Sequence, residues 1–186
     1  MERESKTLTK WLLYVATLWG FLIYFIWYCV NPKQPTYTIQ EFYFLRPNPG
    51  NYTPTSNSTR LFSFKLEIKN PNKQAGIYHD ETSLKFGFGK WILGEETIPS
   101  FYQKKGGSTR QMEGYVNNAN KRLRKKIDRT ISNSTVELKV ALVTKIRYQT
   151  FGWETYHRGV NLDGCIRIGS DGKILGNKKK ITLHHT

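Results

Sequence analysis

Cysteine is scarce in this sequence, with only two among 186 residues, Cys29 and Cys165. Small domains without a sufficient core are usually held together by several disulfides, so this chain must depend on its hydrophobic core. The two cysteines are far apart in sequence, and Cys29 lies at the outer end of an apolar segment, so we expect no bridge between them. Cys165 is expected to be a buried small side chain, with intermolecular pairing as the alternative.

Acidic residues are also few: 14 Asp and Glu stand against 29 Lys and Arg, which gives a formal net charge of +15. One interpretation of this excess is a solvated, solubilising surface. The other is attraction to a polyanion such as an acidic polysaccharide, anionic lipid head groups or an acidic protein. The charge is unevenly spread: one group is the run Lys178–Lys180, and the other, which we call the basic region, contains Lys104, Lys105, Arg110, Lys121, Arg122, Arg124, Lys125, Lys126 and Arg129.

Catalytic, metal-binding and nucleic-acid motifs are missing. The sequence has no G-x-S-x-G elbow, no H-E-x-x-H pair and no P-loop, and Gly106-Gly107-Ser108-Thr109 lacks P-loop spacing. Adjacent residues on a strand point to opposite faces, which argues against a joint role for His79 and Asp80. A Cys165–His157 nucleophile pair is left open by the sequence but nothing supports it. We therefore expect no enzyme, no catalytic residue, no cofactor, no metal and no nucleic-acid partner.

Only one long hydrophobic run is present, Trp11–Val30, and it carries no charge. A membrane-spanning helix needs roughly 20 apolar residues, since each contributes ~1.5 Å toward ~30 Å of hydrocarbon. A cleaved signal peptide is the competing interpretation. Its apolar core would be ~7–15 residues long and would end in a small-residue cleavage site. The run is longer and ends without such a site, so the sequence favours an uncleaved anchor.

The flanks of this run predict its orientation and the domain boundaries. Three basic residues precede it, and only Lys33 follows closely, so the amino terminus should be cytoplasmic. We divide the chain into a cytoplasmic tail (1–10), an anchor (11–30), a Pro-containing linker (31–35) and an extracytoplasmic domain (36–186). The sequence thus predicts a single-pass protein of the plasma membrane with an apoplastic domain. Three N-x-[ST] sequons, all beyond the anchor, are candidate glycosylation sites: Asn51, Asn57 and Asn133.

Period-two alternation of apolar residues dominates the domain. It is clear in residues 62–68, 136–148 and 160–168, and weaker in 36–45, 84–88, 91–98 and 111–116. Asp171-Gly172 between apolar runs predicts a type I′ hairpin that returns through Ile174 and Leu175. The best helix candidate, 118–128, has few apolar positions. The pattern predicts an all-β antiparallel sandwich behind one N-terminal transmembrane helix.

Several segments resemble one family. Residues 66–73 with 76–80 are similar to the NPN…GIYYD segment of the plant non-race-specific disease resistance / harpin-induced-like family. Residues 98–104 resemble its V-P-x-F-Y-Q-G stretch, and 151–155 with 177–181 resemble its closing strands. In the family's YYD the second Tyr is His79 here. The motif positions are Asn70, Pro71, Asn72, Lys73, Gly76, Ile77, Tyr78 and Asp80. From the residues alone, Pro71 between two asparagines should end the preceding strand.

The resemblance implies a late embryogenesis abundant type 2 domain, a seven-stranded sandwich related to fibronectin type III, at the plasma membrane and in pathogen defence. It supplies no catalytic residue. The leading hypothesis is a non-enzymatic defence or stress-response protein whose basic surface binds an acidic cell-wall polymer or a membrane-protein partner. The alternative is a stress-protective lipid- or protein-binding module that acts during dehydration without a signalling role. The sequence does not indicate an oligomeric state.

Overall fold

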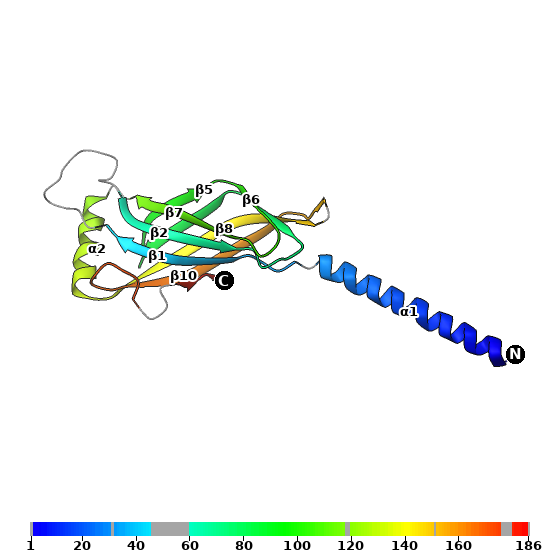
Figure 1. Cartoon of the computed structure of the whole chain (residues 1–186). Helices are drawn as coiled ribbons and strands as arrows, with labels where there is room; N and C mark the ends of the chain where they lie inside the picture. The colour runs from blue at the N-terminus through cyan, green and yellow to red at the C-terminus, as the bar shows by residue number, and fades with distance from the viewer. Residues whose placement is uncertain are drawn as a thin grey trace. The chain divides into compact units, whose positions relative to one another are not determined.

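The structure is a computed structural model that describes residues 2–30, 32–45, 60–117, 120–150, 152–175 and 180–185. It divides into two compact units, Met1–Lys33 and Gln34–Thr186, which we describe separately. The first contains the helix α1 (Glu2–Val30), and the second contains every strand and the helix α2 (Lys121–Asn133) (Figure 1).

Helix α1 is long and apolar enough to cross a membrane between Thr7 and Trp27, with a mean hydropathy of 1.4. None of that span is buried against protein. The hydroxyl of Thr17 donates to the carbonyl of Tyr14 at 2.8 Å, so this polar group is satisfied within the helix. By length and composition alone, a signal sequence near an amino terminus would fit equally well.

The first sheet of the domain has the strand order β11-β1-β2-β7 and is antiparallel throughout its described pairs. Thr36 pairs with Lys69, and Lys69 with Thr109, so these three residues mark one end of the domain. We call it the entry end, because β1 begins there. The strands are β1 (Thr36–Phe44), β2 (Arg60–Lys69), β7 (Thr109–Asn117) and β11 (Ile181–Thr182).

The second sheet has the order β12-β10-β8-β3-β6, and β8 also pairs with β4, which pairs with β5. The long strand β8 is the organising element, since β3, β4, β9 and β10 all pair with it. The strands are β3 (Gly76–His79), β4 (Thr82–Phe88), β5 (Trp91–Ile98), β6 (Phe101–Gln103), β8 (Val136–Thr150), β9 (Trp153–Glu154), β10 (Arg158–Ile168) and β12 (His184–His185).

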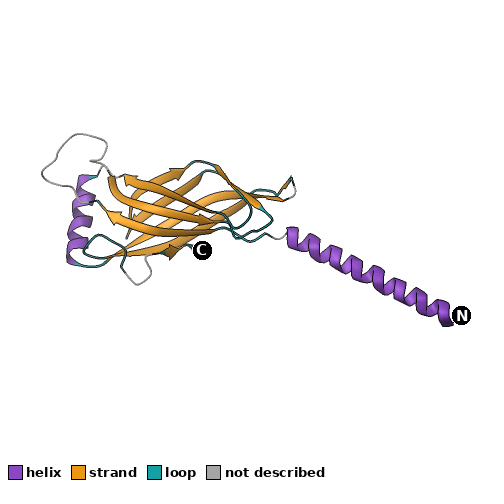
Figure 2. Cartoon of the chain, in the orientation of Figure 1, coloured by secondary structure: helices purple, strands orange, loops and turns teal. Residues whose placement is uncertain are grey.

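The two sheets enclose one hydrophobic core, and Figure 2 shows the strands as its walls with α2 at one end. The ring of Phe86 from the second sheet lies 5.7 Å from that of Phe42 and 5.1 Å from that of Phe64, both from the first sheet. Strands β2 and β8 bury alternate side chains, because successive residues point to opposite faces. The predicted all-β class is confirmed. The strand count differs: five strands of two to four residues accompany the seven long ones in the described chain.

Strand β1 changes its buried face partway along. Tyr37 and Ile39 are buried in its first half and Phe42 and Phe44 in its second, and the register with β2 shifts between Ile39 and Glu41. A β-bulge inserts one residue and so moves the side-chain alternation by one position. This shift explains why the sequence pattern of residues 36–45 is weak although the strand is real.

The predicted type I′ hairpin at Asp171-Gly172 is wrong in detail. The Gly172 N–H donates to the Gly169 carbonyl at 2.9 Å, and Gly169 in turn donates to the Lys173 carbonyl at 2.9 Å. The loop therefore has three residues, Ser170 to Gly172, and Gly172 has a φ of 78°. A three-residue hairpin needs a left-handed residue at its last position, which glycine supplies without strain. The returning segment makes only single bridges and no strand.

The prediction that Cys165 is buried is wrong. Its thiol is free and exposed on β10. Leu162 and Ile166 of the same strand are buried, and Cys165 is an odd number of residues from both, so it points to the opposite face.

Candidate interaction surface

The NPN motif organises the loops of the entry end. The side-chain amide of Asn70 donates to the carbonyls of Ala75 at 2.9 Å and Lys104 at 3.2 Å, and its oxygen accepts from the Asn72 backbone N–H at 2.9 Å. The Asn72 carbonyl accepts from Gly106 at 3.1 Å. Both asparagines are buried. As expected, β2 ends at Lys69, and the motif acts first as a structural element that ties residues 70–75 to 104–108.

The rest of the motif lies along β3. A Cβ at Gly76 would lie 2.2 Å from the hydroxyl oxygen of Tyr102, so a larger residue there would displace that ring. Ile77 belongs to the core, while Lys73 is exposed. The half-buried Tyr78 lies under the Arg147 guanidinium, 5.3 Å from the ring centroid. The Asp80 carboxylate lies 3.5 Å from Nε2 of His157.

His79 is the centre of a buried polar network that the sequence analysis did not predict. It is 1% exposed, its Nδ1 lies 3.0 Å from the Tyr37 hydroxyl, and its Nε2 lies 3.1 Å from Oε1 of Gln103. The Gln103 amide nitrogen donates to the carbonyls of Ile68 at 2.9 Å and Ser108 at 2.8 Å, which fixes that side chain with its oxygen toward His79. Nε2 of His79 must therefore carry the proton and donate, and Nδ1 accepts from Tyr37.

Burial sets the protonation of this network. The pKa of His79 is lowered from 6.5 to about 4 chiefly by burial; the bond to Gln103 opposes this in part, and the nearby Arg110 charge adds to it. Burial also raises the pKa of Tyr37. The ring of His79 stacks on Phe101 at 4.4 Å. The network is neutral and fully inside the domain, so its chemistry serves the fold. His79 and Asp80 point apart, as the alternation predicted.

A Cys165–His157 nucleophile pair does not form. Seven residues of extended β10 separate Arg158 from Cys165, a span of roughly 23 Å. Within the described residues no group of three or more His, Cys, Asp or Glu side chains is placed to hold a metal ion.

The described residues include one of the three candidate glycosylation sites. Asn51 and Asn57 lie outside the described residues. Asn133 is the last residue of α2 and is exposed, with the Ser134 and Thr135 of its sequon also at the surface.

The basic region does not form one patch. Lys104, Lys105 and Arg110 lie at the entry end, where the Arg110 guanidinium covers the ring of Phe101 at 4.4 Å. Strand β7 then runs to Asn117, roughly 23 Å further along, before α2 begins. The lysines and arginines of α2 therefore lie at the opposite end of the domain (Figure 1), which we call the α2 end. The sequence could not predict this separation, because residues close in sequence are far apart across one long strand.

The α2 end concentrates charge and an exposed aromatic side chain. Arg122, Lys125, Lys126 and Arg129 are exposed, and Trp91 is 45% exposed. The ammonium groups of Lys90 and Lys126 lie 5.5 Å and 5.8 Å from the Trp91 ring centroid, so the tip of the β4–β5 hairpin joins the helix in one surface. We call this the α2 surface: Lys90, Trp91, Arg122, Lys125, Lys126 and Arg129.

Helix α2 begins with an Asn cap and an unusual charge arrangement. The side chain of Asn120 accepts from the N–H groups of Arg122 at 3.1 Å and Leu123 at 3.2 Å. The first turn holds no acidic residue and the last turn no basic one. Cations at the positive end of the helix dipole are unfavourable, by about 0.3–1 kcal/mol each. Arg124 makes a hydrogen bond to the domain: its Nη2 donates to the Leu45 carbonyl at 2.9 Å.

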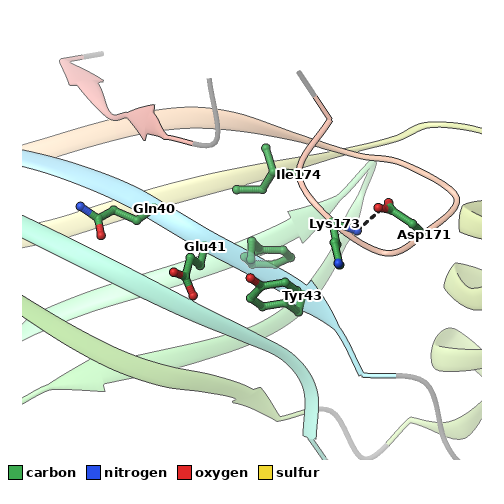
Figure 3. A pocket seen from close by; sticks show the side chains of 7 residues that line it. Gln40, Glu41, Tyr43, Asp171, Lys173 and Ile174 are labelled. Carbon is green, nitrogen blue, oxygen red and sulfur yellow. Dashed lines mark hydrogen bonds between the residues drawn. The ribbon is translucent and has the colours of Figure 1, made fainter. Parts of the chain in front are cut away.

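A shallow hollow of about 200 Å³ lies beside β1, where the loop of residues 170–175 lies against the end of that strand (Figure 3). Glu41, Tyr43, Asp171 and Lys173 contribute polar groups to its lining, and the Lys173 backbone N–H donates to Oδ1 of Asp171 at 3.0 Å. Its charges are mixed in sign. The hollow could not be predicted from the sequence, because its two walls lie about 130 residues apart in the chain. Its lining contains neither a set of metal ligands nor a nucleophile beside a general base.

Comparisons with known proteins place the chain among plant relatives. No family model matches. The Arabidopsis thaliana protein NDR1 is 26% identical over 176 residues, covering 88% of this chain and 76% of the relative. The Arabidopsis thaliana NDR1/HIN1-like protein 26 is 30% identical over 87 residues, covering 44% of this chain and 38% of the relative. The solution structure of a putative late embryogenesis abundant protein, At2g46140.1, covers 75% of each chain at 15% identity with a TM-score of 0.40. The chain is homologous to NDR1 and the NDR1/HIN1-like proteins of Arabidopsis.

Proposed function

We propose that this is a non-enzymatic, single-pass plasma-membrane protein of the plant defence and stress response, whose extracellular β domain binds an acidic cell-wall polymer through the α2 surface. The homology to NDR1 supports the defence or stress role. The apolar span Thr7–Trp27 supports an anchor. The observation that carries the binding proposal is the concentration of exposed cations around Trp91 at the α2 end.

The arrangement of α2 favours an anionic ligand over a purely solubilising role. Five of its first six residues are lysine or arginine, at the end where the helix dipole is positive. Without a ligand, these cations lower the stability of the helix. A bound polyanion would offset their unfavourable interaction with the helix dipole. A polysaccharide bearing carboxylates would gain from the spread of charges, and a sugar ring would gain from the exposed indole of Trp91. In this proposal the alternative ligand of the α2 surface, in place of the polymer, is a partner ectodomain with an acidic face.

The test compares two charge reversals of equal size at opposite ends of the domain. The full chain in lipid nanodiscs would be titrated with polygalacturonate at low and at high salt. Lys125→Glu/Lys126→Glu should weaken binding at least tenfold, while Lys104→Glu/Lys105→Glu should leave it within about twofold. Wild-type binding should also fall steeply with salt, because the screening length shrinks from ~10 Å at 0.1 M to ~3 Å at 1 M.

Fully methyl-esterified pectin, which lacks the carboxylate charge, is the control polymer and should not bind. Equal binding by the wild type and by Lys125→Glu/Lys126→Glu would overturn the α2 surface. Binding that resists both salt and charge reversal would favour the stress-protective lipid- or protein-binding module instead.

A further inference from the structure

The entry end exposes two large aromatic side chains that the binding proposal does not use. Trp153 is 81% exposed and Tyr156 is 96% exposed, and both lie in the turn that joins β8 to β10. Tryptophan and tyrosine combine an apolar ring with a polar group, and they gather where apolar and aqueous surroundings meet. Two such side chains, three residues apart and both in water, indicate a surface that is covered in the working protein.

The described part of this turn, residues 152–157, is bonded to the end of β8. Gln149 pairs with Glu154, and the Thr155 N–H donates to the Tyr148 carbonyl at 2.9 Å. The Thr155 hydroxyl accepts from the Tyr148 N–H at 3.0 Å, and the Arg147 guanidinium lies 3.0 Å from the Glu154 carboxylate. The two aromatic rings are therefore presented outward by a braced hairpin, and little conformational freedom would be lost on docking.

Positive charge surrounds these aromatics. The entry-end segments 69–81, 103–109 and 145–158 contain seven Lys and Arg against three Asp and Glu. Of those three acids, Glu154 pairs with Arg147, Asp80 contacts the His157 ring, and Glu81 is exposed. Sheet pairing of Gly76 with Gln149 and the bond from Asn70 to the Lys104 carbonyl bring the segments together. The exposed cations that remain are Lys69, Lys73, Lys104, Lys105, Lys145 and Arg158.

The chain reaches this end directly from the anchor. Helix α1 ends at Val30 and β1 begins at Thr36. An extended chain covers at most ~3.6 Å per residue, so the linker can span roughly 20 Å. For a chain anchored through residues 11–30, Thr36 at the entry end stays within that distance of the lipid head groups.

We propose that the entry end docks on the phospholipid head-group layer beside the anchor, with Trp153 and Tyr156 inserted at the interface and the surrounding cations on lipid phosphates. This inference rests on the proposed anchoring and is independent of polymer binding at the α2 end. Docking would hold the domain in one orientation, with the α2 surface directed away from the bilayer. The anchor would then fix position and the hairpin would fix orientation.

The experiment uses the full chain in nanodiscs whose lipids carry a head-group quencher. A fluorophore is attached either to Cys165 or to a Gly159→Cys, Cys165→Ser variant, with Cys29→Ser in both. The two sites lie on the same strand and the same exposed face, roughly 20 Å apart. Gly159 has open space around its Cα, so a cysteine fits there. Docking predicts several-fold stronger quenching at residue 159 than at residue 165.

Substitutions distinguish docking of the domain on the bilayer from simple proximity through the linker. Trp153→Ser/Tyr156→Ser should abolish most of the quenching at residue 159, whereas Trp91→Ser, which removes an exposed tryptophan at the α2 end, should not. Lys104→Glu/Lys105→Glu should weaken quenching in discs that contain phosphatidic acid. Unchanged quenching in the Trp153→Ser/Tyr156→Ser variant would overturn docking, since the linker alone would then explain proximity. A chain that fails to co-elute with the discs would contradict the anchoring, and docking with it, whatever its affinity for polygalacturonate.

Discussion

At the scale of single residues, His79 is the most constrained polar side chain of the domain. It donates to Gln103 and accepts from Tyr37, and the ring of Phe101 covers it. Protonation of Nδ1 would place a charge in the core and remove the acceptor of the Tyr37 hydroxyl. The network therefore stabilises the fold only while His79 is neutral.

The pH dependence follows from this. Between pH 6.5 and about 4 the unfolded chain binds a proton at His79 and the folded chain does not. Acidification through this range therefore favours unfolding, and the stability contribution is present above pH 6.5 and lost as the pH falls. The full loss is on the order of 3 kcal/mol, of which about 2 kcal/mol should appear between pH 6.5 and 5.

The measurement is the free energy of unfolding of the full chain by urea in a mild detergent at several pH values. His79→Phe should be less stable near neutral pH, because Tyr37 and Gln103 lose their partner. The free energy of unfolding of this variant should also depend less steeply on pH than that of the wild type, because the contribution of His79 titration is missing. A slope as steep in the variant as in the wild type would contradict this assignment.

The sequence predicted some residue roles and could not predict others. Asn70 and Pro71 were expected to end a strand, and they do, because that role depends on local backbone chemistry. The burial of His79 depends on Tyr37 and Gln103, which lie 42 and 24 residues away in the chain. Nothing in the immediate sequence of a histidine reveals such partners.

At the scale of elements, α2 lies where the sequence suggested a candidate helix but is shifted toward the carboxyl end. Its buried side chains are Leu123, Ile127 and Ile131, spaced by four residues. Ile131 lies beyond the candidate range 118–128, so only two of the three were counted and the stripe was not evident. The spacing of four is the signal that would have identified the helix.

Helix α2 is attached to the domain chiefly through these three side chains, so truncation of one should be costly. Ile127→Ala should lower the free energy of unfolding by about 2–4 kcal/mol, because the fully buried side chain leaves a cavity. The exposed Lys125→Ala on the same helix should change it by less than about 0.5 kcal/mol. Urea unfolding of both variants provides the comparison, and similar stabilities would show that α2 does not pack as described.

At the scale of the whole molecule, the class of fold was predictable and the distribution of charge was not. Alternation in residues 62–68, 136–148 and 160–168 depends on one buried face per strand, a property that each segment carries by itself. The division of the basic region between two ends depends on the direction and length of β7. A surface built from α2 and the tip of the β4–β5 hairpin joins segments about 35 residues apart, which only the fold brings together.

The central claim is that the β domain lies outside the cell on a membrane anchor. The exposed thiol of Cys165 allows a direct test. Desolvation and the neighbouring Glu137 raise the pKa of that thiol, so labelling is best done near pH ~8 after mild reduction. The measurement is labelling of full-length Cys29→Ser protein in intact plant protoplasts with a membrane-impermeant maleimide, with Cys29→Ser/Cys165→Ser as the blank. The account predicts labelling without permeabilisation; labelling only after the membrane is opened would contradict it.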